Sequence, residues 1–215
     1  MTKTMMKTKH AVYALLGTAL FYASCSSKSE QAVAPNIANE TITQASLKLT
    51  NEANAGDTTS CTYTFHVDNN GNVTSTDSTA LILKANSKYD VKVYMLDQTQ
   101  SPVFVVSNEI KDRQNYHLFF YQPTPINVAP VISNTSPYIP GTPVSQLNPL
   151  NLTIARTDHD TNNPPLEVGL TALFTTGAAS TGNLRWILRH QPNAKNGTFA
   201  PGSSDLDVNF VTTIK

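Results

Sequence analysis

Histidine and aspartate are the residue types in this sequence that best suit metal chemistry. Four histidines follow the N-terminal segment, and one of them lies between two aspartates in the run Asp158-His159-Asp160. Imidazole nitrogens and carboxylate oxygens are ligands that zinc and copper take in proteins. No two histidines are spaced so that a single element would supply two ligands. A metal site would therefore have to be assembled from separate elements of the fold.

Each of these residues also has a plain structural interpretation. His66 falls on the polar face of an alternating strand, where a solvated side chain is expected. His117 and His190 stand near strand ends, where a histidine with a structural hydrogen bond is a common alternative. The segment from Asp158 to Asn162 places oxygens at alternate positions, as a calcium loop does. It lacks the glycine and the glutamate that such a loop needs at positions six and twelve, so a turn is favoured.

Signatures of common enzyme classes are missing from the sequence. It contains no Gly-x-Ser-x-Gly elbow, no phosphate-binding P-loop and no dinucleotide fingerprint. Cys61 has no cationic neighbour in the sequence, which favours a buried apolar role over a reactive thiol. We therefore expect a binding protein rather than an enzyme.

Aromatic residues raise carbohydrate binding as a further candidate function. A sugar site needs exposed rings for stacking, and the candidates are Tyr138, Phe199, Phe104 and Trp186. Trp186 alternates with leucines on one face of its strand and is expected in the core. Tyr138 lies in a proline-rich segment and is the better candidate for a ligand contact.

The N-terminus has the pattern of an export signal. Three lysines precede an apolar stretch at residues 11–22. This stretch is shorter than the roughly 20 apolar residues that a transmembrane helix needs. The small residues before Cys25 resemble a bacterial lipobox, although Tyr22 replaces the usual aliphatic residue. We predict a lipoprotein signal peptide at 1–24, a lipid such as palmitate on Cys25, and a flexible tether over 25–40. An ordinary cleaved signal with an incidental cysteine is the alternative.

Charge and composition exclude several classes of protein. The 215 residues have a formal net charge of zero and only 14% charged residues, while Thr, Asn and Ser number 28, 20 and 17. Balanced charge argues against a nucleic-acid-binding protein. Loss of residues 1–24 removes three lysines and leaves 12 basic and 15 acidic residues, a net charge of −3. Cys61 would then be alone, so the domain is expected to fold without a disulfide.

Period-two alternation predicts an all-β domain over residues 41–215. Cys61, Tyr63, Phe65 and Val67 share one face of a predicted strand, and the cluster Asn54–Asp57 before them is a turn signal. No segment has a convincing helical pattern. The spacing of strands and turns predicts an antiparallel, immunoglobulin-like β-sandwich of about 8–9 strands. Besides 46–50 and 61–67, strands are predicted at 79–84, 89–97, 103–107, 116–121, 151–157, 168–176, 184–190 and 206–214.

The segment 123–149 contains seven of the 13 prolines. Proline cannot donate a hydrogen bond to a neighbouring strand, so a long loop or an edge meander is predicted there. Loops of this length in compact domains are often functional.

Several short motifs occur in the order found in a family of small Bacteroidota lipoproteins, which this sequence resembles. Members of that family are often labelled "type 1 periplasmic binding" proteins. The motifs are Leu83–Tyr89, Asn108-Glu109-Ile110, Tyr116–Tyr121, Thr157–Asp160, Pro165–Leu170, Gly182-Asn183-Leu184, Leu188–Pro192 and Asp205–Phe210. The label implies an α/β fold, whereas the alternation predicts strands, and we follow the alternation.

The resemblance implies a lipid-anchored accessory protein at the outer membrane, beside a TonB-dependent receptor that takes up a small ligand or a metal ion. It implies no catalytic residues. A surface glycan-binding or structural cell-envelope module is the alternative function. Three histidines lie in the region of resemblance, and with the two flanking aspartates they form the predicted site for zinc or another divalent metal: His117, His159, His190, Asp158 and Asp160.

Overall fold

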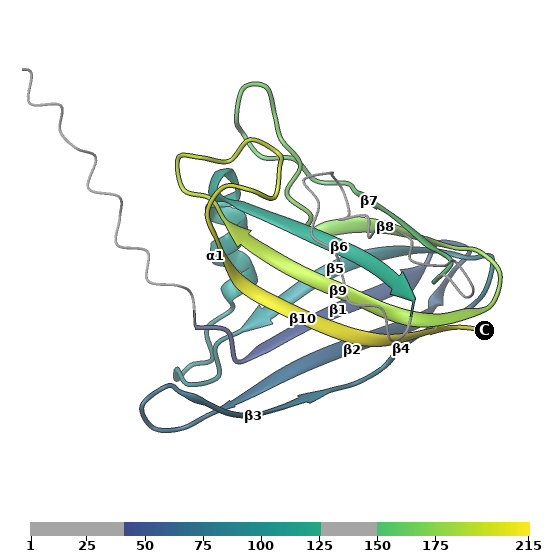
Figure 1. Ribbon diagram of the computed structural model, residues 1–215, viewed down its shortest axis with the longest axis horizontal. Coiled ribbons are helices and arrows are strands. Elements are labelled where there is room, and N and C mark those ends of the chain that lie inside the picture. The colour runs from purple at the N-terminus through teal and green to yellow at the C-terminus, as the bar shows by residue number, and fades with distance from the viewer. Residues whose placement is uncertain (1–40, 126–149) are drawn as a thin grey trace, which may run out of the picture. The chain divides into compact units, whose positions relative to one another are not determined.

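The computed structural model describes residues 41–125 and 150–215, and β-strands dominate them (Figure 1). Within these ranges ten strands form two sheets, and β6, β9 and β10 lie in front of β1, β2 and β5 in the view of Figure 1. The strands are β1 (Gln44–Asn51), β2 (Asn54–Val67), β3 (Val73–Ser78), β4 (Leu81–Leu83), β5 (Lys88–Leu96), β6 (His117–Pro125), β7 (Leu152–Arg156), β8 (Thr171–Thr176), β9 (Ser180–His190) and β10 (Ser203–Ile214).

One sheet has six strands in the order β3-β2-β1-β5-β8-β7, and the other has four in the order β4-β10-β9-β6. Neighbouring strands are antiparallel except for β4, which runs parallel to β10. The prediction of an all-β fold in two layers is confirmed. The predicted antiparallel arrangement holds for every pair but this one.

The core lies between the two sheets and follows the alternation that the sequence shows. In β5, Tyr89, Val91, Val93 and Met95 are buried while the residues between them are exposed. The same core contains Trp186 from the other sheet, which is fully buried, as predicted. Burial of such side chains contributes roughly 1.5–3 kcal/mol each, so this apolar layer holds the sheets together.

The hairpin of β1 and β2 corrects one predicted turn. The chain reverses at Glu52 and Ala53, and β2 already begins at Asn54, where the sequence predicted a turn. Further along β2, Cys61 is buried and Tyr63 and Phe65 pack against the core, as predicted. Burial raises the pKa of the Cys61 thiol to about 12, which agrees with an inert structural cysteine.

Three elements were not predicted: β3, a short helix and a 3-10 turn. Strand β3 has six exposed residues, so no alternation of apolar and polar side chains marks it. Residues 103–107 were predicted as a strand, but only Phe104 pairs with Asp97, in an isolated bridge. The helix α1 (Val106–Asp112) and a 3-10 turn (Gln114–Tyr116) follow. Helix α1 buries Val106 and Ile110, which are four residues apart, and packs on β5. Because it is only seven residues long, its helical pattern is too short to stand out in the sequence.

Several predictions lie outside the described residues. These are the signal peptide 1–24, the lipid site Cys25, the tether 25–40, Tyr138 and most of the segment 123–149. Strand β6 runs into that segment and is the edge strand of its sheet, where prolines are tolerated. Among the described residues, no helix has the length and apolar character needed to span a membrane.

Candidate metal centre at one end of the sheets

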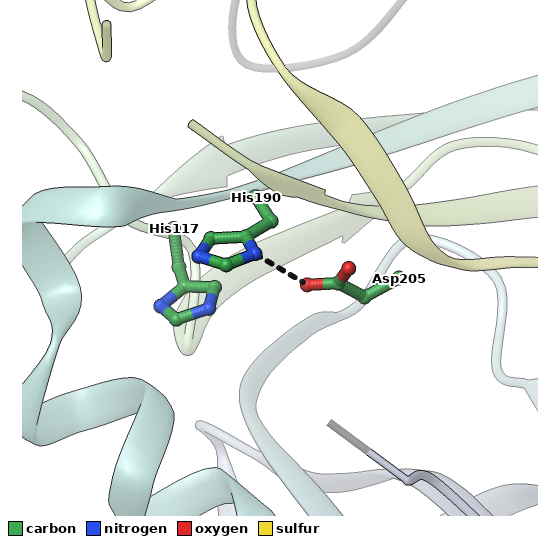
Figure 2. A group of neighbouring side chains, drawn as sticks. All are labelled: His117, His190 and Asp205. Atoms are coloured by element: carbon green, nitrogen blue, oxygen red, sulfur yellow. Dashed lines mark ion pairs between the residues drawn. The ribbon is translucent and has the colours of Figure 1, made fainter. Parts of the chain in front are cut away.

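Three buried side chains converge from three adjacent strands of the four-stranded sheet (Figure 2). His117 is the first residue of β6 and His190 the last of β9, and the two are direct cross-strand partners. Asp205 lies near the start of β10. One potential ligand atom from each of the three lies within 4.8 Å of the others. The set combines two imidazoles with one carboxylate.

Strand alternation directs both histidines into the space between the sheets. His117 is in phase with Phe119 and Tyr121 of β6, and His190 is in phase with Trp186 and Leu188 of β9. Alternate residues of a strand point to the same face. The two histidines therefore form the last layer of the core, and less than a tenth of each is exposed.

A β-bulge turns Asp205 inward. The buried residues Leu206 and Val208 alternate along β10, so an undisturbed strand would point Asp205 away from the core. The register with β9 shifts between Ser204 and Leu206, and the extra residue at the bulge is Asp205. Its side chain is fully buried.

Gly202 brings the start of β10 against the end of β9. Its φ is +77°, and a Cβ at this position would lie 1.9 Å from the carbonyl oxygen of His190. Any other residue would clash with that backbone atom. The glycine therefore permits the close approach that places Asp205 beside His190.

The surroundings of His117 keep its imidazole ring neutral, which is the form that binds a metal. Its Nδ1 lies 3.1 Å from the carbonyl oxygen of Arg113. A carbonyl can only accept, so Nδ1 carries the proton and Nε2 carries the lone pair. Burial lowers the pKa of His117 to about 4, so the ring is neutral at neutral pH. Metal-bound histidines characteristically donate their second nitrogen to a carbonyl or a carboxylate in this way.

The two imidazole rings stack on each other, with centroids 4.9 Å apart and planes inclined by 13°. His190 Nδ1 lies 3.8 Å from Asp205 Oδ2, at ion-pair distance but beyond a hydrogen bond (Figure 2). Ligand atoms on one tetrahedral zinc ion lie about 3.4 Å apart, given bonds of about 2.1 Å. Binding of one ion would therefore draw the three groups together and rotate the rings out of the stack.

Asp205 is a buried residue of the cluster whose carboxylate lacks hydrogen bonds from the part of the chain that the structure describes. Neither of its carboxylate oxygens has a hydrogen-bond partner among the described residues, and the same is true of His190 Nε2. Burial raises the pKa of the Asp205 carboxyl. Burying a carboxylate without such partners lowers the stability of the folded state by several kcal/mol. Native proteins normally provide such groups with hydrogen bonds, cationic partners or metals. A cation between Asp205 and the histidines would satisfy these unpaired atoms together.

The other predicted ligands are used elsewhere. Both oxygens of Asp158 accept backbone N–H groups, from Gly169 and Leu170. Asp160 accepts two backbone N–H groups and forms a fully buried ion pair with Lys195, at 2.7 Å.

His159 is exposed and pairs through its backbone with Glu167. The structure brings His117 and His190 together, but the cluster that it forms from the described residues does not include His159 or its two neighbours. The carboxylates of that segment stabilise a turn, which agrees with the simpler interpretation of the motif.

Asp205 is the residue that sequence reasoning missed. Alternation assigns it to the outer face, and the bulge that reverses its direction leaves no mark in the pattern of apolar residues. A signal for the pair His117 and His190 did exist, since each continues the core-facing row of its strand.

The aromatic candidates for sugar stacking are also dispersed. Phe199 packs edge-on against Phe120, at 5.3 Å between ring centroids, and Trp186 is in the core. Phe104 is 38% exposed and belongs to the isolated bridge with Asp97. These rings form no shared platform.

No protein-family model, curated protein or solved structure matches this chain.

Proposed function

We propose that this protein is a non-enzymatic binding protein that holds one divalent transition-metal ion between His117, His190 and Asp205. The observation that carries the proposal is the Asp205 carboxylate, which is buried beside two histidines and has no hydrogen-bond partner among the described residues. Nothing else within the described residues offers this carboxylate a hydrogen bond. A cation supplies what the site lacks.

The donor set favours zinc over calcium or magnesium. Two imidazole nitrogens and one carboxylate oxygen match the ligands of zinc sites, whereas calcium and magnesium prefer oxygen ligands alone. Three protein ligands leave one tetrahedral position for water or for a group from a partner. Because His117, His190 and the Asp205 side chain are buried, exchange of the ion should be slow.

Binding fits the surroundings of the cluster better than catalysis. A Ser or Cys nucleophile has to lie within hydrogen-bond reach of its histidine base. Among the described residues, His190 Nε2 has no such partner, and the hydroxyl of the nearby Ser204 is held by Arg189. Among the described residues, the histidines of the cluster therefore have no Ser or Cys nucleophile to activate.

The wider role of the protein is inferred from its sequence. The lysines, the apolar stretch and the small residues before Cys25 support export and lipid anchorage. The motif resemblance supports an accessory role in uptake by an outer-membrane receptor. Together with the site, these features favour a protein that holds a metal ion for a receptor in the same membrane.

The strand order supports an immunoglobulin-like topology for the domain. The run β1-β5-β8-β7 has the order of strands A, B, E and D, and β6-β9-β10 has that of C, F and G. The short β4 switches to the second sheet and pairs with β10 in parallel. In this arrangement the β2–β3 hairpin is an insertion that widens one sheet.

Equilibrium dialysis of the purified protein against zinc, followed by elemental analysis, tests the proposal. We expect one zinc per chain, and we expect Asp205→Asn and His190→Gln to lose it. His66→Gln is the matched control, since His66 is half exposed and pairs with Asp77. Absence of stoichiometric metal in the wild-type protein, or retention of zinc by both site variants, would refute the metal site.

A further inference from the structure

A groove of about 570 Å³ crosses the outer face of the six-stranded sheet, on the side away from the core. It is formed by the central strands β1, β2 and β5, far along the chain from the candidate metal ligands. Its lining is polar, with two lysines, one aspartate, one tyrosine and several hydroxyl groups. The principal side chains are Lys48, Lys92, Tyr94, Asp90, Thr58 and Ser60.

Two positive charges face each other in this groove. Lys48 and Lys92 are direct cross-strand partners, and both are exposed. Like charges in this position destabilise a sheet. No carboxylate lies within ion-pair distance of either ammonium in the part of the chain that the structure describes, although the sheet offers acidic partners to other cations such as Lys84. The pair is therefore left open to an anionic group from outside.

Tyr94 provides an exposed aromatic face beside the two lysines. The side chain is 39% exposed, and Lys48 Nζ lies 4.2 Å from the centre of its ring. A tyrosine ring combines a large apolar face with a polar tip, a combination suited to contact surfaces. Lys48 lies over one face of this ring, so that face becomes free to stack on the C–H side of a sugar ring when the Lys48 ammonium turns to a bound carboxylate.

The remaining groups of the groove suit hydroxyls rather than a simple anion. The Asp90 carboxylate can accept hydrogen bonds, and the hydroxyls of Thr58 and Ser60 can both accept and donate them. The Asp90 carboxylate is a good acceptor for sugar hydroxyls, which suits a ligand that carries hydroxyl groups beside its acidic group. Charge, ring and hydroxyl groups thus favour one class of ligand.

We propose that this groove binds an acidic saccharide, with its sugar ring on Tyr94, its carboxylate between Lys48 and Lys92, and its hydroxyls on Asp90. The site is independent of the metal centre and shares no residue with it. It places glycan recognition on the sheet face, in residues that the sequence did not single out.

Isothermal titration calorimetry with a linear trigalacturonate tests the proposal, with neutral maltotriose and inorganic phosphate as comparison probes. We expect the acidic trisaccharide to bind and both comparison probes to bind at least about tenfold more weakly. Tyr94→Ala and Lys92→Gln should each weaken binding about tenfold, the effect of losing one charged or stacking contact. Lys111→Gln, which removes an exposed lysine of α1, should leave the affinity unchanged.

Three outcomes would overturn the inference. Wild-type protein that does not bind the trigalacturonate refutes the site, and so does equal binding by the Tyr94 and Lys92 variants. Phosphate that binds as tightly as the trisaccharide shows a response to charge alone and refutes the saccharide. All the substituted side chains are exposed, so a thermal melt of each variant should match that of the wild type. Loss of metal by Asp205→Asn would leave these results unchanged.

Discussion

Two regions of the molecule contain histidine and aspartate close together, and they use these residues in opposite ways. In the segment 158–160, the two carboxylates are fully engaged by backbone N–H groups and by Lys195, and the histidine between them is exposed. In the cluster of His117, His190 and Asp205, the carboxylate has no hydrogen-bond partner among the described residues.

The difference follows from how each group of residues is held. Asp158 and Asp160 follow the end of β7, where backbone N–H groups of the loop that returns to β8 reach their oxygens. Asp205 is held in place by the packing of β10 on the core, which supplies its carboxylate with no hydrogen bond from the described residues. A run of neighbouring His and Asp residues in the sequence is therefore a poor guide to a ligand site. A buried polar group without a hydrogen-bond partner is a better one.

The largest expected effect comes from removing one partner of the buried ion pair between Asp160 and Lys195. Asp160→Ala leaves the ammonium of Lys195 buried without its carboxylate, and loss of one partner of a buried pair costs about 3–5 kcal/mol. Urea denaturation of the metal-free protein measures the change. The double variant Asp160→Ala/Lys195→Met should recover most of the loss, and a single variant as stable as the wild type would contradict a structural role for this pair.

Zinc binding to His117, His190 and Asp205 should raise the stability of the protein. Zinc at one hundred times its dissociation constant should raise the free energy of unfolding by about 2.7 kcal/mol. Asp205→Asn should abolish this gain. Without zinc, the same variant should be at least as stable as the wild type, because it replaces a buried carboxylate that has no hydrogen-bond partner among the described residues. A metal-free Asp205→Asn protein that is markedly destabilised would show that the carboxylate already has a structural partner.

The stability of the protein at acid pH should depend on the carboxylate of Asp160. Burial opposes its ionisation, but hydrogen bonds from Lys195 and from the backbone of Leu166 and Asn162 outweigh burial and hold the pKa of Asp160 below its usual value. A lowered pKa stabilises the folded state fully above the unfolded pKa of about 3.9, and this stabilisation is lost as the pH falls from that value through the lower pKa of the folded state. We expect the free energy of unfolding to fall below pH 4, and to fall less steeply in Asp160→Asn. Parallel pH profiles would refute this contribution.

The smallest expected effect is at His159. Its side chain is exposed, so His159→Ala should change stability by less than about 0.5 kcal/mol and leave zinc binding unchanged. Dialysis and denaturation on the same sample measure both quantities. Loss of zinc in this variant would return His159 to the metal site and reverse the comparison of the two regions.

The fold could be predicted from sequence wherever one face of a strand is buried. The alternation in β2, β9 and β10 places Cys61, Trp186 and Phe210 inside, and all three are fully buried. It failed where burial is absent, as in the exposed β3, and where a helix is too short to repeat its pattern, as in α1. Strand β3 is held instead by its pairing with β2, and α1 by its packing on β5.

The sequence by itself determined the class of fold, because a period of two can be seen without coordinates. It named His117 and His190 only together with His159, which the cluster does not include. Only the tertiary structure decided which carboxylate joins them. A bulge in β10, reached through a left-handed glycine at 202, reverses the direction of Asp205. A change of register between two strands is a relation between segments, and for that reason no local pattern of residues encodes it.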